Sequence, residues 1–238
     1  MSLIPQPHEI KVVRGHYIVD GYKYPRVTSI LKVINKPALL EWYGKMGTKE
    51  AKEFTQLRAE FGTLLHKHIE ELVQLEDDEL NREIPNILKR YENEEMRGCI
   101  LSWLNWKKDK QFGQRQTEAL IISKKHGYAG TLDFYGKVNN SLFLADWKTS
   151  KDVYPEYFLQ MSAYAEGIFE MTGMYPEYAG VVALHGDGSF IYKYINKKQL
   201  KDFFEVFKAC KTIYHWQNSG LASYIPFEKK QTELSEWI

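Results

Sequence analysis

Residues 142–151 read LFLADWKTSK and change from an apolar strand to charged groups within a few positions. Side chains alternate between the two faces of a strand, so Asp146 and Lys148 share one face and Trp147 points to the other. A carboxylate attracts a cation, and an ammonium group neutralises an anion such as phosphate. The strand end therefore predicts a site for a metal ion and a phosphate.

Two further carboxylates are predicted beside Asp146 by the turns that join neighbouring strands. A two-residue turn at the Asn-Asn pair 139–140, which accepts positive φ, places Asp133 opposite Asp146. A four-residue loop KKHG at 124–127 then places Glu118 opposite Asp133. Adjacent carboxylates repel one another unless a cation compensates, so the pattern predicts a divalent-cation site. The alternative is that these acids face solvent at strand ends, because one β-bulge moves a residue to the other face.

Hydrolysis of a phosphodiester is the chemistry that such a group of residues suits. A carboxylate-bound Mg²⁺ or Mn²⁺ lowers the pKa of a bound water and screens the phosphate. Lys148 would orient that water or stabilise the developing negative charge.

The elements that must position these residues follow from hydrophobic periodicity, and the first half of the chain is expected to be mostly helical. His66 falls within a helical pattern, GTLLHKHIEELVQL. We expect a hairpin over 16–27 that turns at Asp20-Gly21. Thr28 is expected to cap one helix and Pro37 to open the next, and a longer helix is expected over 62–75. A further helix is expected from about Pro85 to Lys110, with Trp103 and Trp106 on its apolar side.

The second half changes to short alternating segments and predicts a mixed α/β fold, with a central, mostly antiparallel sheet flanked by helices. We expect one domain over 1–238, with a helical part over about 1–112, a core over about 113–218 and a tail over 219–238. Within the core we expect a three-stranded meander over about 114–148, a helix over 155–173, a strand pair over about 178–195 and a helix over 197–216.

Composition excludes several classes of protein. The chain has 238 residues, 44% of them hydrophobic and 26% charged, and no apolar run reaches the roughly 18 residues of a membrane helix. The first ten residues lack the pattern of a secretory signal, and Cys99 and Cys210 are too few for a disulfide framework or a four-cysteine iron–sulfur cluster. We therefore expect a soluble cytoplasmic protein with no membrane partner.

Net charge is +1 and neither supports nor excludes binding to nucleic acid. Local charge is uneven: residues 70–95 carry ten acids and three bases, a local −7, whereas 107–125 and 192–211 each carry six bases and two acids, a local +4. A polyanion would avoid the first segment and use the other two, unless these charges are simply solvated helix faces.

Four short motifs occur in a fixed order: GTLLH at 62–66, GTLD at 130–133, DWK at 146–148 and QMSAY at 160–164. Together they resemble the RecB-like exonuclease branch of the PD-(D/E)xK nuclease superfamily. The segment at 24–45 is similar to the N-terminal segment of phage-type exonucleases of this branch and of the mitochondrial genome maintenance exonuclease. The resemblance covers about residues 16–170 and implies a restriction-endonuclease-like core.

The resemblance also implies roles for individual residues. Asp133 and Asp146 match the metal-binding acids, and Lys148 matches the catalytic lysine. His66 matches an additional metal ligand of this branch, and the backbone carbonyl of Trp147 a further metal contact.

Residues around this set are expected to support the site or contact DNA. Gln160 and Tyr164 match the helix motif of the branch, and Thr149 and Lys151 follow the catalytic lysine on the substrate side. Glu118 matches an acid often present on the preceding strand. Leu132 replaces the proline of the superfamily's name, and the cysteines of its iron–sulfur members are missing, so no such cluster is expected.

Structural interpretations compete with these roles. A histidine on an apolar helix face is often part of the core, although the ordered motifs favour a ligand role for His66. In the structural interpretation, Gln160 and Tyr164 would only attach their helix to the sheet. His68 lies two positions from His66, cannot share its face, and is interpreted as structural.

The function that follows is a metal-dependent DNA exonuclease that uses Mg²⁺ or Mn²⁺, acts in recombination or end processing, and belongs to the cytoplasm of a bacterium or a phage-infected cell. A structure-specific or flap endonuclease is an alternative within the same class. A non-catalytic nucleic-acid-binding module and a metal-stabilised structural protein are the alternatives from other classes.

Overall fold

The prediction of a mixed α/β fold with a mostly antiparallel central sheet is confirmed by a computed structural model, which describes residues 2–34, 41 and 44–219. The central sheet has five strands in the order β4-β5-β6-β7-β8, and only the β6–β7 pair is parallel. A smaller antiparallel sheet has the order β1-β2-β3. No helix in the described part of the chain is long and apolar enough to cross a membrane.

The bounds of the elements follow chain order. In the first half they are β1 (Ile10–Val13), β2 (His16–Val19), β3 (Tyr22–Pro25), α1 (Val27–Ile30), the 3₁₀ turn η1 (Leu31–Val33), α3 (Thr48–Val73), α4 (Asp77–Lys89) and α5 (Glu94–Lys107). In the second half they are β4 (Phe112–Ser123), β5 (Tyr128–Val138), β6 (Ser141–Lys148), α6 (Pro155–Thr172), β7 (Tyr178–Leu184), β8 (Phe190–Asn196) and α7 (Lys197–Asn218).

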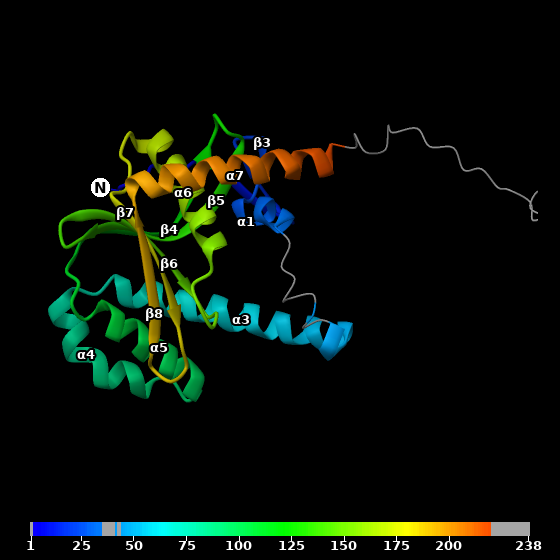
Figure 1. The fold of residues 1–238 in the computed structure, drawn as a ribbon. Helices are drawn as coiled ribbons and strands as arrows, with labels where there is room; N and C mark the ends of the chain where they lie inside the picture. The colour runs from blue at the N-terminus through cyan, green and yellow to red at the C-terminus, as the bar shows by residue number, and fades with distance from the viewer. Residues whose placement is uncertain (1, 35–40, 42–43, 220–238) are drawn as a thin grey trace, which may run out of the picture.

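Helices cover both faces of the five-stranded sheet. In Figure 1, α6 and α7 lie above the sheet, and α3, α4 and α5 lie below it. Each face has its own apolar core: Leu144 of β6 packs on the α6 side, whereas Trp147 packs on the α5 side. The predicted alternation of β6 is therefore confirmed, and its buried middle anchors the strand end that carries Asp146 and Lys148.

The register of the meander is the one that the turns predict. Asn139 and Asn140 both adopt positive φ, at 49° and 68°, and β5 pairs with β6 from Phe134↔Ala145 to Val138↔Ser141. The ladder between β4 and β5 keeps a single register from Ser123↔Tyr128 to Arg115↔Gly136. This register places Glu118, Asp133 and Asp146 on three neighbouring strands.

The strand β5 changes face at Asp133, which alternation alone does not predict. Leu132 and Phe134 lie two residues apart and would share a face in a regular strand, but Leu132 packs in the α6-side core and Phe134 in the α5-side core. Opposite this point, Glu118 has a positive φ of 48°. The acids thus lie where both strands are locally irregular, as is common next to functional sites.

The N-terminal half contains more strand than expected, and α3 begins at Thr48, fourteen residues before the expected start at Gly62. The hairpin at Asp20-Gly21 is confirmed, but β1 adds a third strand to it. Thr28 does not begin a helix, because it lies inside α1 after the N-cap residue Arg26. The helix expected from Pro37 falls largely outside the described residues.

The single helix expected from Pro85 to Lys110 is wrong. Pro85 lies inside α4, and a separate helix α5 begins after Asn93, whose side chain accepts a hydrogen bond from the Met96 amide at 2.8 Å. Asparagine at this position satisfies a backbone N–H that the first helical turn leaves unpaired.

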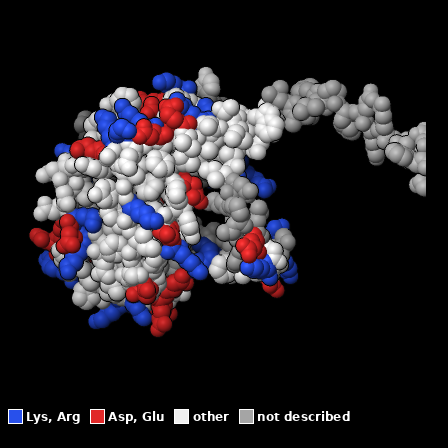
Figure 2. Space-filling model, viewed as in Figure 1, with Lys and Arg blue, Asp and Glu red and all other residues white. Residues whose placement is uncertain are grey.

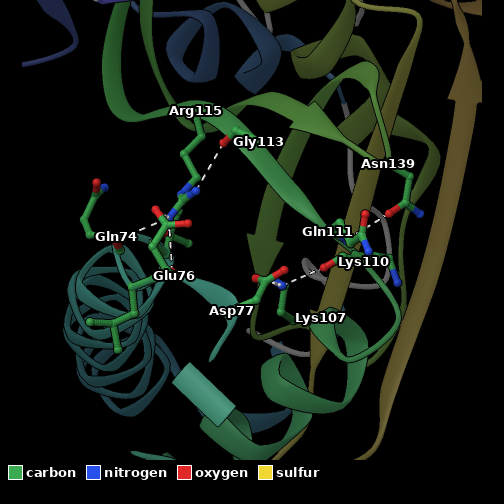
Figure 3. Close-up of polar contacts among 11 residues, drawn as sticks. Gln74, Glu76, Asp77, Lys107, Lys110, Gln111, Gly113, Arg115 and Asn139 are labelled. Carbon is green, nitrogen blue, oxygen red and sulfur yellow. Dashed lines mark hydrogen bonds and ion pairs between the residues drawn. The ribbon is translucent and has the colours of Figure 1, made fainter. Parts of the chain in front are cut away.

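Arg115 of β4 fixes the C-terminal end of α3, the helix that carries His66 (Figure 3). Its Nε donates to the Val73 carbonyl at 2.6 Å, and its Nη2 donates to the carbonyls of Gln74 and Leu75 at 3.2 and 3.1 Å. The carbonyls at the end of a helix have no partner within the helix, so these bonds cap α3 and tie it to the sheet.

Replacing Arg115 with lysine is expected to lower the free energy of unfolding by about 1–3 kcal/mol, because one ammonium group cannot reproduce the planar fork of donors. Urea denaturation measures the change. Arg82→Lys is the matched control, since Arg82 is exposed and makes one bond within α4, to the Asp78 carbonyl at 3.3 Å. Equal stability of the two variants would show that Arg115 does not fix the helix.

Candidate active site

The peptide group of Trp147 links the strand end to its neighbours. Its N–H donates to Asp133 Oδ2 at 2.8 Å, and its carbonyl accepts from His66 Nε2 at 2.9 Å. The ring is 2% exposed and packs against Trp103 and Trp106, with ring centroids 6.4 and 5.0 Å away. The ring therefore lies on the face opposite Asp146 and Lys148, as strand alternation predicts, and its packing holds the peptide group in place.

Three of the predicted metal ligands come together around one point. His66 of α3, Glu118 of β4 and Asp133 of β5 each present a ligand atom, and these atoms lie within 4.8 Å of one another. His66 Nδ1 also lies 3.4 Å from Asp133 Oδ1. One imidazole and two carboxylates are a donor set that fits a divalent cation.

Asp146 lies outside this trio and takes part in a second set of contacts. Its Oδ1 accepts from Gln160 Nε2 at 2.9 Å, and its Oδ2 lies 2.6 Å from Lys148 Nζ. Gln160 Nε2 also donates to the Tyr164 hydroxyl at 3.2 Å, so both residues of the helix motif face the strand end. Asp146 Oδ2 is buried and has no partner in hydrogen-bond geometry among the described residues, despite the close Lys148. Oδ2 is ion-paired with the Lys148 ammonium, and its remaining lone pair is available for a metal contact.

The remaining predicted residues lie at the edge of the site. Thr149 lies near Gly62 of α3, and Lys151 is exposed in the loop between β6 and α6. His68 packs edge-on against Tyr91 with ring centroids 4.8 Å apart.

Two contacts of the site did not follow from the sequence. The Tyr157 ring lies 5.3 Å from Lys148 Nζ and supports the ammonium by a cation–π contact. Gly130, in the GTLD motif, leaves room for the Tyr164 ring, which a β-carbon at this position would overlap. A glycine inside a predicted strand was the available signal for such a close approach.

Burial and charge set the protonation of the trio. Burial lowers the pKa of His66, but the Asp133 carboxylate outweighs this effect and raises it to about 9. Burial would raise the pKa of Asp133, but the His66 imidazolium, Lys148 and the Trp147 amide hold it below its ordinary value. Burial raises the pKa of Glu118 to about 7, and the charge of Asp133 adds to the shift.

The pKa values of Asp146 and Lys148, in the second set of contacts, are also shifted. Burial raises the pKa of Asp146 to about 6 against the opposing effect of Lys148. Burial would lower the pKa of Lys148, but the Asp146 and Asp133 carboxylates raise it, so the ammonium stays charged at neutral pH. Such strongly shifted groups gathered in one place are typical of functional sites.

The affinity for Mn²⁺ is expected to rise with pH from about 6.5 to about 8.5. Below a pKa of about 7 for Glu118 and about 9 for His66, each group holds a proton that must leave before it can bind a cation. Calorimetric titration in two buffers of different ionisation enthalpy measures both affinity and proton release. A flat affinity with no proton release would contradict this assignment of ligands.

Comparisons with known proteins show only a weak structural similarity. No protein-family model matches it, and no curated protein matches it. Among solved structures, an alkaline exonuclease from Laribacter hongkongensis (LHK-Exo) is similar, with 12% identity and a TM-score of 0.29, over 66% of this chain and 92% of that chain. A likeness at this TM-score does not establish a shared fold or activity.

Proposed function

We propose that the protein is a divalent-metal-dependent deoxyribonuclease that degrades DNA from an end. The observation that carries the proposal is the trio of His66, Glu118 and Asp133, with ligand atoms within 4.8 Å, beside the Asp146–Lys148 ion pair on the next strand. A metal-binding group of side chains next to a charged lysine is an arrangement that suits phosphodiester hydrolysis.

The residues that would hold Mg²⁺ or Mn²⁺ are the trio, together with Asp146 Oδ2 and the carbonyl of Trp147. Their oxygen-rich donor set fits such an ion, and Asp146 Oδ2 beside Lys148 adds a further carboxylate oxygen. When bound, the ion lowers the pKa of a water and screens the charge of the phosphate.

The chain's own groups have separate tasks in this proposal. Lys148 keeps its ammonium charged beside Asp146 and is 22% exposed at its side chain, so it can reach a phosphate oxygen. Gln160 fixes the orientation of Asp146 through a buried hydrogen bond. The Trp147 amide holds Asp133 by its Oδ2 and leaves Oδ1 facing His66.

The preference for DNA and for strand ends rests on the resemblance of the four ordered motifs to RecB-like exonucleases. Charge gives modest support, because Lys198 and Lys208 of the basic segment 192–211 are paired with Asp202 and Glu205. Figure 2 shows blue and red side chains side by side at the top of the molecule, where α7 lies in Figure 1. A substrate path is therefore expected to depend on the site itself more than on a broad basic surface.

The test is a digestion panel with the purified chain of residues 1–238. Linear single-stranded, linear duplex and circular DNA, end-labelled where they have ends, are incubated in Mg²⁺, Mn²⁺ or EDTA. We expect linear DNA to shorten from an end only with metal while circles survive. Cutting of circular single strands would favour the flap endonuclease instead, and binding without any cleavage would overturn the enzymatic proposal.

A further inference from the structure

A second group of metal-ligating side chains lies away from the site described above. His126 belongs to the loop at the tip of the β4–β5 hairpin, and Glu166 and Glu170 lie one turn apart on α6. Ligand atoms of the three residues lie within 4.8 Å of one another. Asp133 lies inside β5 and Gln160 lies more than one helical turn earlier on α6, so the two groups are separate.

Glu170 is held in place by the hairpin loop. Its Oε1 accepts from Ser123 Oγ at 2.5 Å and its Oε2 from the Lys125 amide at 3.1 Å. Ser123 Oγ also accepts from the His126 amide at 3.1 Å. One carboxylate is thus oriented by surrounding donors, as the ligands of metal sites commonly are.

Two buried polar atoms next to this group have no partner. His126 Nε2 and the Tyr175 hydroxyl are both buried without a hydrogen bond among the described residues, and Tyr175 is only 8% exposed. Both residues line a cavity of about 380 Å³, which Glu166 also lines. Unpaired buried polar atoms are costly, so two of them on the wall of one cavity fit a site that binds a polar ligand or an ion.

We propose that His126, Glu166 and Glu170 bind one transition-metal ion of the Zn²⁺ type, with the Tyr175 hydroxyl beside a water in the remaining position. One imidazole and two carboxylates are typical of such ions. The first site has the same three donor types, but there Asp146 and the Trp147 carbonyl add the oxygen ligands that Mg²⁺ and Mn²⁺ prefer. Ligands about 2.1 Å from a tetrahedral zinc lie about 3.4 Å from one another. His126 Nε2 and Glu170 Oε1 are already 3.9 Å apart, so a small shift and a rotation of the Glu166 side chain would close the site.

The lysines of the cavity weaken simple electrostatic attraction of cations. Lys197 and Lys201 lie over the Tyr175 ring, at 5.4 and 5.8 Å from its centroid, and Lys208 pairs with Glu205 at 2.8 Å. A site among such charges needs the directional bond to an imidazole nitrogen, which again favours Zn²⁺ over Mg²⁺.

The ion would join two elements, and a hydrogen bond links them to a third. His126 brings the tip of the β4–β5 hairpin, and the glutamates bring α6, while Lys211 of α7 donates to the His126 carbonyl. The expected role is therefore structural: the ion pins the hairpin to the helix that carries Gln160.

The test begins from a His66→Ala, Asp133→Asn double variant, which removes the first site. Titration with Co²⁺, followed by its visible absorption and by calorimetry, should give one equivalent per chain with the spectrum of four- or five-coordinate cobalt. Zn²⁺ should displace it and raise the melting temperature. Adding His126→Ala should weaken binding at least about tenfold. The matched control is Glu205→Gln, a carboxylate of the same cavity outside the trio, which should leave binding unchanged.

No binding to the double variant, or unchanged binding after His126→Ala, would overturn the proposal. Stabilisation by inorganic phosphate without any effect of Zn²⁺ would also overturn it and make the cavity an anion site. Should the double variant not fold, His126→Ala in the otherwise native chain should bind one equivalent of Co²⁺ fewer than the native chain does. An equal stoichiometry would overturn the proposal.

Discussion

Asp146→Asn is expected to lower the rate of metal-dependent DNA cleavage by at least about a thousandfold, with little change in folding. Asparagine keeps the size of the side chain and can keep the hydrogen bond from Gln160, but it removes the charge next to Lys148. A loss of about 4 kcal/mol of transition-state stabilisation corresponds to this factor. Release of label from linear DNA in Mg²⁺ and Mn²⁺ measures the rate.

Two further variants make this result specific to the site. Asp202→Asn applies the same change to an exposed acid of α7 that pairs with Lys198, and it should retain full activity. Lys148→Ala should be as inactive as Asp146→Asn, because the two groups form one ion pair. An Asp146→Asn protein that is folded and still cleaves at a rate within tenfold of the native rate would refute the assigned role.

Gly98→Ala is expected to lower the free energy of unfolding by at least about 3 kcal/mol. Gly98 of α5 lies directly against the backbone of Gly186 in the β7–β8 turn, and a β-carbon at this position would overlap the Gly186 carbonyl. The overlap involves backbone on both sides, so relief requires α5 to move away from the turn. This cost exceeds the roughly 1 kcal/mol that alanine gains over glycine in a helix.

Urea denaturation followed by circular dichroism measures this effect. Gly44→Ala is the matched control, because Gly44 is also helical but has open space where its β-carbon would lie. We expect this control to be neutral or slightly stabilising. Equal stability of the two variants would mean that α5 and the turn are not packed as closely as described.

Local chemistry explains which parts of the fold were predictable. The Asn139-Asn140 turn determines the register of β5 and β6 because its positive φ angles leave few alternatives. The single helix expected from about Pro85 to Lys110 was wrong because proline is tolerated inside α4, while the boundary between α4 and α5 is made by Asn93. The change of face at Asp133 depends on packing against two different cores, which no local pattern encodes.

Some features of the candidate site were likewise predictable from the sequence, and others were not. The strand register brings Glu118 and Asp133 together, and the GTLLH motif on α3 adds His66 to them. The roles of these three residues as metal ligands remain predictions. The separate pairing of Asp146 with Lys148 was not expected from the opposed acids alone. Arg115 was not predicted either, because its partners belong to a helix some forty residues earlier in the chain.

The peptide group of Trp147 gives the site an unusual resistance to mutation. Its two bonds, to Asp133 and His66, come from the backbone, so no substitution at position 147 other than proline can delete the donor, and none can delete the acceptor. What a substitution changes is the ring, and with it the fit against Trp103 and Trp106. Sequence variation at position 147 would therefore reflect changes in core packing, although the main chain of the same residue makes the hydrogen bonds to Asp133 and His66.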